Sequence, residues 1–117
     1  MPQLIESPIR IPVPGGKVID EYVGRASSST SAVSVAHMKA PPGWEEPAQK
    51  PEFDEVTLVL AGLVRVEHDA GVLEVAAGQA VLTSAGERVR YSVGENGAEY
   101  VAVCLPAFDP GLANRDD

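Results

Sequence analysis

Short apolar runs alternate along most of the chain with clusters of Gly, Pro, Asp and Asn, whereas signals for helices are scarce. β-branched residues are frequent in these runs, which is typical of strands. The sequence predicts strands over residues 9–13, 18–23, 32–38, 55–61, 63–67, 72–75, 80–83, 88–93 and 99–105. Their spacing of roughly eight to twelve residues favours an all-β, closed or nearly closed antiparallel architecture.

Turn residues mark several of the boundaries between these strands. Pro14-Gly-Gly-Lys17 connects the first two strands, and the first is expected at a sheet edge because its prolines cannot donate to a ladder. Asp69-Ala-Gly71 predicts a hairpin turn, and residues 44–53 are expected to form a loop.

The length of 117 residues, with 44% hydrophobic and 22% charged residues, suits one globular domain with a single core. Within this domain we expect amino-terminal strands and a covering segment over 1–31, a barrel core over 32–105, and a tail over 106–117. No apolar stretch approaches the roughly 20 residues of a membrane-spanning helix, and the first residues lack the features of a signal peptide. We therefore expect a cytoplasmic protein without a membrane partner.

The charge balance also bears on partners. Seventeen acidic residues against nine basic residues give a net charge of -8, which repels phosphate backbones, so nucleic acid is not an expected partner. Cys104 is the only cysteine, which rules out an internal disulfide and predicts a small buried apolar residue.

Glycine spacing gives the most specific signal in the chain. The pattern Gly43-x5-Gln49-x-Pro51-x3-Glu55-x6-Gly62 resembles the first cupin motif, and Gly78-x5-Ser84-x-Gly86-x2-Val89-x3-Val93 resembles the second. The sequence is therefore similar to the small single-domain members of the cupin superfamily. The resemblance implies a jelly-roll β-barrel, also called a double-stranded β-helix.

Metal-binding cupins use two histidines, a glutamate and a third histidine from these motifs. The matching positions here hold Gln49, Pro51, Glu55 and Val89, of which Glu55 alone is a good ligand. No cofactor is therefore expected. A divalent metal would need substitute ligands, and Glu55, Gln49 and His37 are the candidates.

The resemblance also predicts which way side chains face, because they alternate along a strand. The inward set is Glu55, Thr57, Val59, Val89, Tyr91 and Val93. Val56, Leu58 and Leu60 then point outward and are also apolar, so this face needs a cover. A second sheet, the amino-terminal segment or another subunit would serve, and a homodimer is the simplest expectation.

Glu55 is the candidate proton-transfer group, because burial without a cationic partner can raise a carboxyl pKa by up to about 3–5 units. Gln49, Thr57 and Tyr91 are candidates for positioning a substrate, and Tyr91 also for acid catalysis. The strand that carries His37 can lie beside Glu55, which makes its imidazole a candidate base.

The acidic loop before Glu55 offers a second kind of contact. Glu46, together with the ring face of Trp44, could hold a cationic ligand, with a cation–π contribution of about 0.5–2 kcal/mol. A solvated acidic loop without a binding role is the alternative.

The sequence thus favours a small-molecule-binding cupin, an enzyme that transfers protons as an isomerase, lyase or hydrolase without the usual metal centre. One alternative is a ligand-binding or sensing module that is not catalytic. A second alternative is a metalloprotein with substitute ligands.

Overall fold

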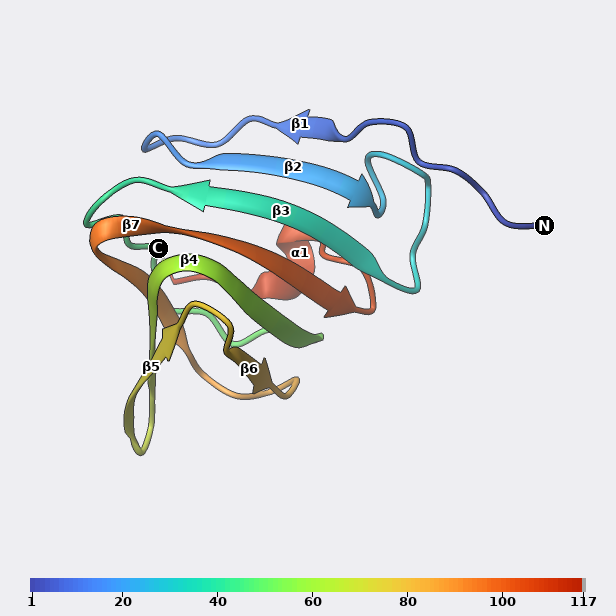
Figure 1. Cartoon of the computed structure of the whole chain (residues 1–117). Coiled ribbons are helices and arrows are strands. Elements are labelled where there is room, and N and C mark those ends of the chain that lie inside the picture. The colour runs from blue at the N-terminus through green and yellow to red at the C-terminus, as the bar shows by residue number, and fades with distance from the viewer. Residues whose placement is uncertain (117) are drawn as a thin grey trace.

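The computed structural model of the protein describes residues 1–116. These residues form the strands β1 (Ile9–Ile11), β2 (Val18–Val23), β3 (Ser34–Ala40), β4 (Asp54–His68), β5 (Gly71–Ala76), β6 (Ala80–Thr83) and β7 (Arg90–Leu105), and the short helix α1 (Pro110–Ala113). The sheet order is β1-β2-β3-β7-β4-β5, with β6 also paired to β4 (Figure 1). All of these pairs are antiparallel.

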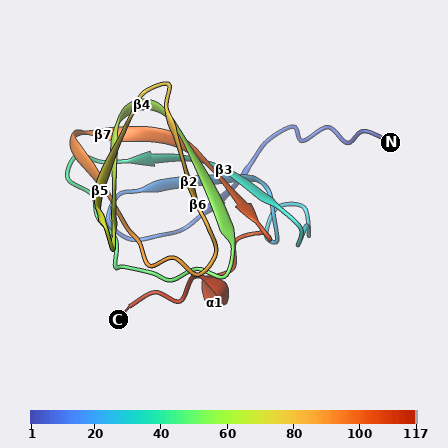
Figure 2. The same cartoon turned by 90° about the horizontal axis from the view of Figure 1, so that it is seen from below.

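The strands curve around a central space, with α1 at one end (Figure 2). The fold is a small antiparallel β-barrel of the cupin type, which confirms the fold class predicted from the sequence. Within the described residues 1–116, no helix is long and apolar enough to cross a membrane.

Two long, bent strands connect the halves of the barrel. β4 pairs with β5 and β6 and also with β7 along most of its length. The sequence predicted two strands in place of each long one, which is wrong because the glycines at the bends do not end the strands. Gly62 has a φ of 78°, and a Cβ atom there would lie 2.1 Å from the carbonyl oxygen of Gly97. The absence of a side chain at Gly62 therefore lets the backbones of the paired strands β4 and β7 approach closely at this point.

Apolar packing fills one end of the barrel and leaves the other end open. A cluster of buried side chains, mostly from β4, β5 and β7, closes the first end, and Val59 and Val64 are its most buried members. A second cluster joins Phe53 and Cys104 to Ala113 of α1. The buried Cys104 agrees with the sequence prediction.

Residues 106–116, expected to be a tail, instead pack against the barrel. The Asp109 side chain accepts a hydrogen bond from the Gly111 amide and caps α1. Ala113 is fully buried, and Arg115 lines the cavity described below. The composition of residues 106–116 did not reveal this packing, because Ala113 and Arg115 contact residues distant in sequence.

The outer face of β4 remains exposed in the single chain. Leu58 and Leu60 are 41% and 46% exposed, which agrees with the outward facing predicted for them. β1 and β2 do not cover this face, because they extend the sheet on the far side of β3.

Candidate functional site

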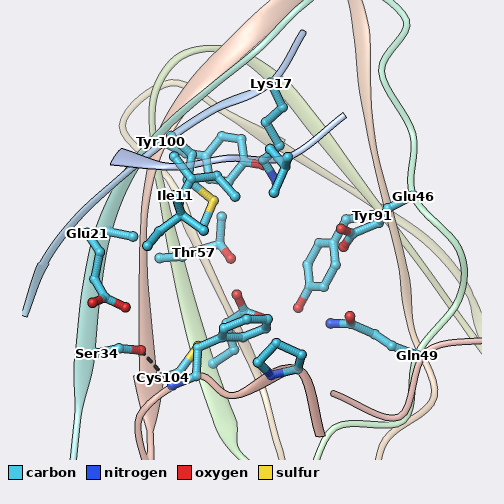
Figure 3. Close-up of a pocket in the computed structure, with 18 of the residues that line it drawn as sticks. Ile11, Lys17, Glu21, Ser34, Glu46, Gln49, Thr57, Tyr91, Tyr100 and Cys104 are labelled. Atoms are coloured by element: carbon cyan, nitrogen blue, oxygen red, sulfur yellow. Dashed lines mark hydrogen bonds between the residues drawn. The ribbon is translucent and has the colours of Figure 1, made fainter. Parts of the chain in front are cut away.

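A cavity of about 240 Å³ lies at the open end of the barrel, between β3, β4, β7 and the connection from β1 to β2 (Figure 3). Its polar lining includes Glu55, Thr57, Tyr91, Gln49 and Glu46. Aliphatic and aromatic side chains make up much of the remaining wall. The cavity combines an apolar wall with a few placed polar groups, which is the usual character of a ligand site.

Glu55 occupies the start of β4, opposite Cys104 of β7 and Thr83 of β6. Protein surrounds its carboxyl group, whose remaining exposure is to the cavity. Burial raises the pKa of Glu55 to about 7, and the charge of Glu46 acts in the same direction. The Tyr91 hydroxyl favours the ionised form and limits this rise. A carboxyl with a pKa near neutrality can both accept and donate protons at physiological pH.

Tyr91 enters the cavity from the first half of β7. Its hydroxyl lies 3.0 Å from Oγ1 of Thr83, and both side chains are buried. Burial, followed by the charge of Glu55, raises the pKa of Tyr91. The hydroxyl therefore stays protonated at physiological pH and can donate a hydrogen bond to Glu55 or to a ligand.

Charged side chains gather at the mouth of the cavity. The backbone amide of Gln49 donates a hydrogen bond to the carbonyl of Val89, just before β7, at 2.8 Å. The side-chain Oε1 of Gln49 accepts a hydrogen bond from Arg115 Nε at 3.1 Å. Arg115 Nη2 lies 3.4 Å from the Glu46 carboxylate. Burial raises the pKa of Glu46, while Lys17 and Arg115 oppose this effect.

The structure brings together Glu55, Tyr91, Gln49, Glu46 and Thr57, five of the seven residues proposed from the sequence. Trp44 lines an adjoining groove instead, where Lys17 of the same chain already lies 3.9 Å above its ring.

His37 lies outside the cavity, so the structure does not bring it together with the other residues proposed from the sequence. Its neighbours Ala36 and Met38 line the cavity, and alternation along β3 therefore turns His37 outward. Its Nε2 lies 2.6 Å from the Glu99 carboxylate on β7. The sequence could not assign this facing because no residue of β3 belongs to the two motifs.

The position of His37 also removes the metal site proposed from the sequence, because Glu55, Gln49 and His37 do not converge. Among residues 1–116, no group of three or more His, Cys, Asp or Glu side chains is arranged to hold a metal ion. The donors present near Glu55 therefore do not fit a resident transition metal.

Two residues that the sequence did not suggest also line the cavity: Lys17 and Arg115. Lys17 follows a turn and Arg115 follows α1, so neither has a strand alternation that would predict its facing. Tyr100 and Cys104 were also missed, although they alternate on β7. Knowing that Cys104 pairs with Glu55 across β7 and β4 would have placed both Cys104 and Tyr100 inside the barrel.

Comparison with known proteins gives one sequence relative and several structural neighbours. No protein-family model matches the chain. The chain is 47% identical over 107 residues to a Myxococcus xanthus protein named endoribonuclease YbeY. The match covers 91% of this chain and 36% of that protein, so the chain spans about a third of the relative's length.

The solved structures share the fold at low sequence identity. A variant of oxalate decarboxylase from Bacillus subtilis has a TM-score of 0.79 and 18% identity, over 95% of this chain and 31% of that chain. A variant of Streptomyces PAC13, solved with uridine, has a TM-score of 0.76 and 14% identity, over 97% of this chain and 88% of that chain. PAC13 is a nucleoside dehydratase. These likenesses support the barrel fold alone.

The endoribonuclease relative corrects several expectations from the sequence. It contradicts the assignment to the cupin superfamily, the expected enzyme acting on a small-molecule metabolite, and the expectation of a metal-independent protein. It also contradicts the expected partners, since nucleic acid was excluded and a small molecule favoured. A divalent metal is plausible for such a relative, although residues 1–116 have no ligand group for one. The glycine spacing therefore predicted the fold correctly, whereas the family and the function predicted from it were wrong.

Proposed function

We propose that this chain is an RNA-recognition unit whose barrel receives a single nucleoside unit of an RNA chain. The observation that carries the proposal is the cavity of about 240 Å³ at the open end of the barrel. Ligand pockets commonly measure roughly 300–1,000 Å³, so this cavity lies just below that range. It suits one base with its ribose, and it is too small for a folded or double-stranded segment.

The sequence relative supports RNA as the partner. The Myxococcus xanthus protein, 47% identical over the matched residues, is named for cutting RNA. A role in RNA processing also agrees with the cytoplasmic location expected from the sequence.

The cavity wall offers the contacts that an unstacked nucleoside uses. Glu55, Thr57 and Tyr91 supply hydrogen-bond donors and acceptors, and Tyr100 supplies an aromatic side chain. Sequence-specific RNA recognition commonly splays bases out, stacks them on aromatic rings and reads their polar edges. These groups could also contact the ribose 2′-hydroxyl, which distinguishes RNA from DNA.

The net charge of -8 limits how the RNA can bind. An acidic surface repels a long run of phosphates, so most of the affinity must come from the unit inside the barrel. For single-stranded nucleic acid, the logarithm of the affinity falls by about 0.7 for each unit of the logarithm of salt concentration, for every phosphate that the protein neutralises. We expect a slope near this value, which corresponds to one phosphate.

Fluorescence anisotropy with short labelled RNAs tests the proposal. We expect binding to single-stranded RNA, competition by a free nucleoside, and weaker binding to the matching duplex and to DNA. Ala102, a buried residue of the cavity wall, gives a blocking variant, Ala102→Leu. Ala70→Leu, in the exposed turn between β4 and β5, is the matched control.

Ala102→Leu should lose binding while Ala70→Leu keeps it, with thermal unfolding used to check that both variants fold. Failure of wild type to bind any of the single-stranded RNAs would refute the proposal. Unchanged binding by a folded Ala102→Leu variant would refute the cavity as the site.

A second candidate function is RNA cleavage by proton transfer, favoured by the Glu55 pKa of about 7. In this reaction the Glu55 carboxylate accepts the proton of a ribose 2′-hydroxyl. The 2′ oxygen bonds to phosphorus, the bond from phosphorus to the 5′ oxygen breaks, and that oxygen takes a proton from water. The hydroxide left by the water then takes the proton from Glu55, which restores the carboxylate. The products are a 2′,3′-cyclic phosphate and a 5′-hydroxyl end.

Mass spectrometry of RNA incubated with wild type and with Glu55→Gln tests this chemistry. We expect cyclic-phosphate products from wild type and at least a hundredfold slower cleavage by the variant, in line with the usual contribution of a general base. Equal cleavage by both proteins would rule out Glu55 as the base. The relative's activity can reside in the part of its length that this chain does not match.

A further inference from the structure

Two cationic side chains stand at the opening of the cavity, where it meets a shallower groove. Lys17 and Arg115 line both hollows, as does Glu46. A ligand that enters the barrel from the groove must therefore pass beside both cations. The position matters because a nucleoside bound inside would leave its phosphate at this opening.

Lys17 is held by aromatic rings instead of by a carboxylate. Its Nζ lies 3.9 Å from the centroid of the Trp44 ring and 5.4 Å from that of the Tyr100 ring. The side chain extends from the β1–β2 connection towards the cavity interior (Figure 3). Within residues 1–116, its ammonium group makes no side-chain hydrogen bond and no ion pair, so its three N–H donors remain available.

Arg115 uses only part of its hydrogen-bonding capacity. Its Nε donates to Gln49, and its Nη2 lies 3.4 Å from the Glu46 carboxylate. The side chain is 44% exposed, whereas that of Glu46 is 11% exposed. A guanidinium has five N–H donors, so Arg115 retains donors that face the opening.

The two cations differ in their direct partners. Arg115 lies 3.4 Å from the Glu46 carboxylate, whereas no carboxylate among residues 1–116 forms an ion pair with Lys17, on which Glu46 and Glu55 act without direct contact. An anion placed between Lys17 and Arg115 would give Lys17 the direct partner that it lacks. Its hydrogen bonds to both cations would be charge-assisted and stronger than neutral ones.

We propose that Lys17 and Arg115 form a phosphate subsite at the cavity mouth, which holds the phosphate of the nucleotide whose nucleoside lies in the barrel. The subsite rests on the proposed function and makes its substrate class specific: a phosphorylated nucleotide unit instead of a free nucleoside. Trp44 and Tyr100 hold the Lys17 ammonium in place for this contact.

Isothermal titration calorimetry with the four ribonucleosides and their 3′- and 5′-monophosphates tests the subsite. We expect one series of monophosphates to bind at least about tenfold more tightly than the nucleosides, from charge-assisted hydrogen bonds of about 1.5–3 kcal/mol. Lys17→Met keeps the aliphatic contact with the rings and should remove this gain, measured as the ratio of monophosphate to nucleoside affinity within the variant. Arg115→Gln should reduce the gain as well.

Lys39→Met is the matched control, since Lys39 is exposed and does not line the cavity. It should leave the phosphate gain intact. If nucleosides bind and their monophosphates bind no more tightly, the subsite is refuted. It is also refuted if the phosphate gain survives in both Lys17→Met and Arg115→Gln. In both cases nucleoside recognition stands. If neither nucleosides nor nucleotides bind, recognition and subsite are refuted together.

Discussion

Replacing Glu55 with glutamine should make the protein more stable at alkaline pH. The pKa of Glu55 is raised by burial from its ordinary value of 4.5 to about 7. The folded state therefore binds this proton more tightly than the unfolded state does. The stability gained from keeping this proton bound is fully present below about pH 4.5 and is lost as the pH rises from 4.5 to 7.

The magnitude follows from the size of the shift. One pKa unit corresponds to about 1.4 kcal/mol, so the ionised carboxylate costs the fold roughly 3 kcal/mol above pH 7. Glu55→Gln keeps the side-chain shape and cannot ionise. The stability difference between variant and wild type should therefore grow by roughly 2–3 kcal/mol between pH 5 and pH 8, in favour of the variant.

Urea unfolding at a series of pH values measures this difference. With a typical m value of about 1–3 kcal/mol per M, the midpoint of the variant should gain roughly 1–2.5 M relative to wild type between pH 5 and pH 8. Glu95→Gln, at an exposed position of β7, is the matched control and should change stability by less than about 0.5 kcal/mol throughout. A difference between Glu55→Gln and wild type that does not vary with pH would refute the reasoning.

The remaining predictions concern the barrel's bend, its buried hydroxyl pair and its outer face. Gly62→Ala puts a Cβ 2.1 Å from a backbone oxygen of β7 and should destabilise the fold by about 4 kcal/mol or more in thermal unfolding. Gly78 has open space around it, so its change to alanine should cost roughly 1–2 kcal/mol in the same measurement. Tyr91→Phe leaves the buried Thr83 hydroxyl without its partner and should cost about 1–3 kcal/mol in urea unfolding; an unchanged midpoint would contradict this pairing. His37→Asn should change stability by less than about 1 kcal/mol and leave RNA affinity unaltered, because the pair that it breaks is on the outer face; a loss of affinity would return this residue to the site.

Side-chain facing along single strands was predictable from the sequence. Once Glu55 was assigned to the interior, alternation correctly gave inward Thr57 and Val59 and outward Leu58 and Leu60. Such facing follows from local geometry and needs only one anchored residue per strand.

Strand continuity and the cavity mouth were not predictable in the same way. Gly62 resembles a turn in sequence, and only its close approach to β7 explains why β4 continues through it. His37 had no anchored neighbour on its strand, so its outward facing required the pairing of β3 with β7. Lys17 and Arg115 meet only because the chain folds two distant loops over the same opening.

The distribution of charge bears on the proposed binding of RNA by an acidic protein. Four surface arginines are paired with carboxylates of this chain: Arg10 with Asp20, Arg65 with Glu74, Arg88 with Asp116, and Arg90 with Glu45. These guanidinium groups are already compensated, so they offer little to a phosphate backbone. Among residues 1–116, Lys17 has no such partner, and it lines the cavity. The net charge argues against extended backbone contacts, and Lys17 leaves one cationic side chain at the entrance, as the proposal of a single bound RNA unit requires.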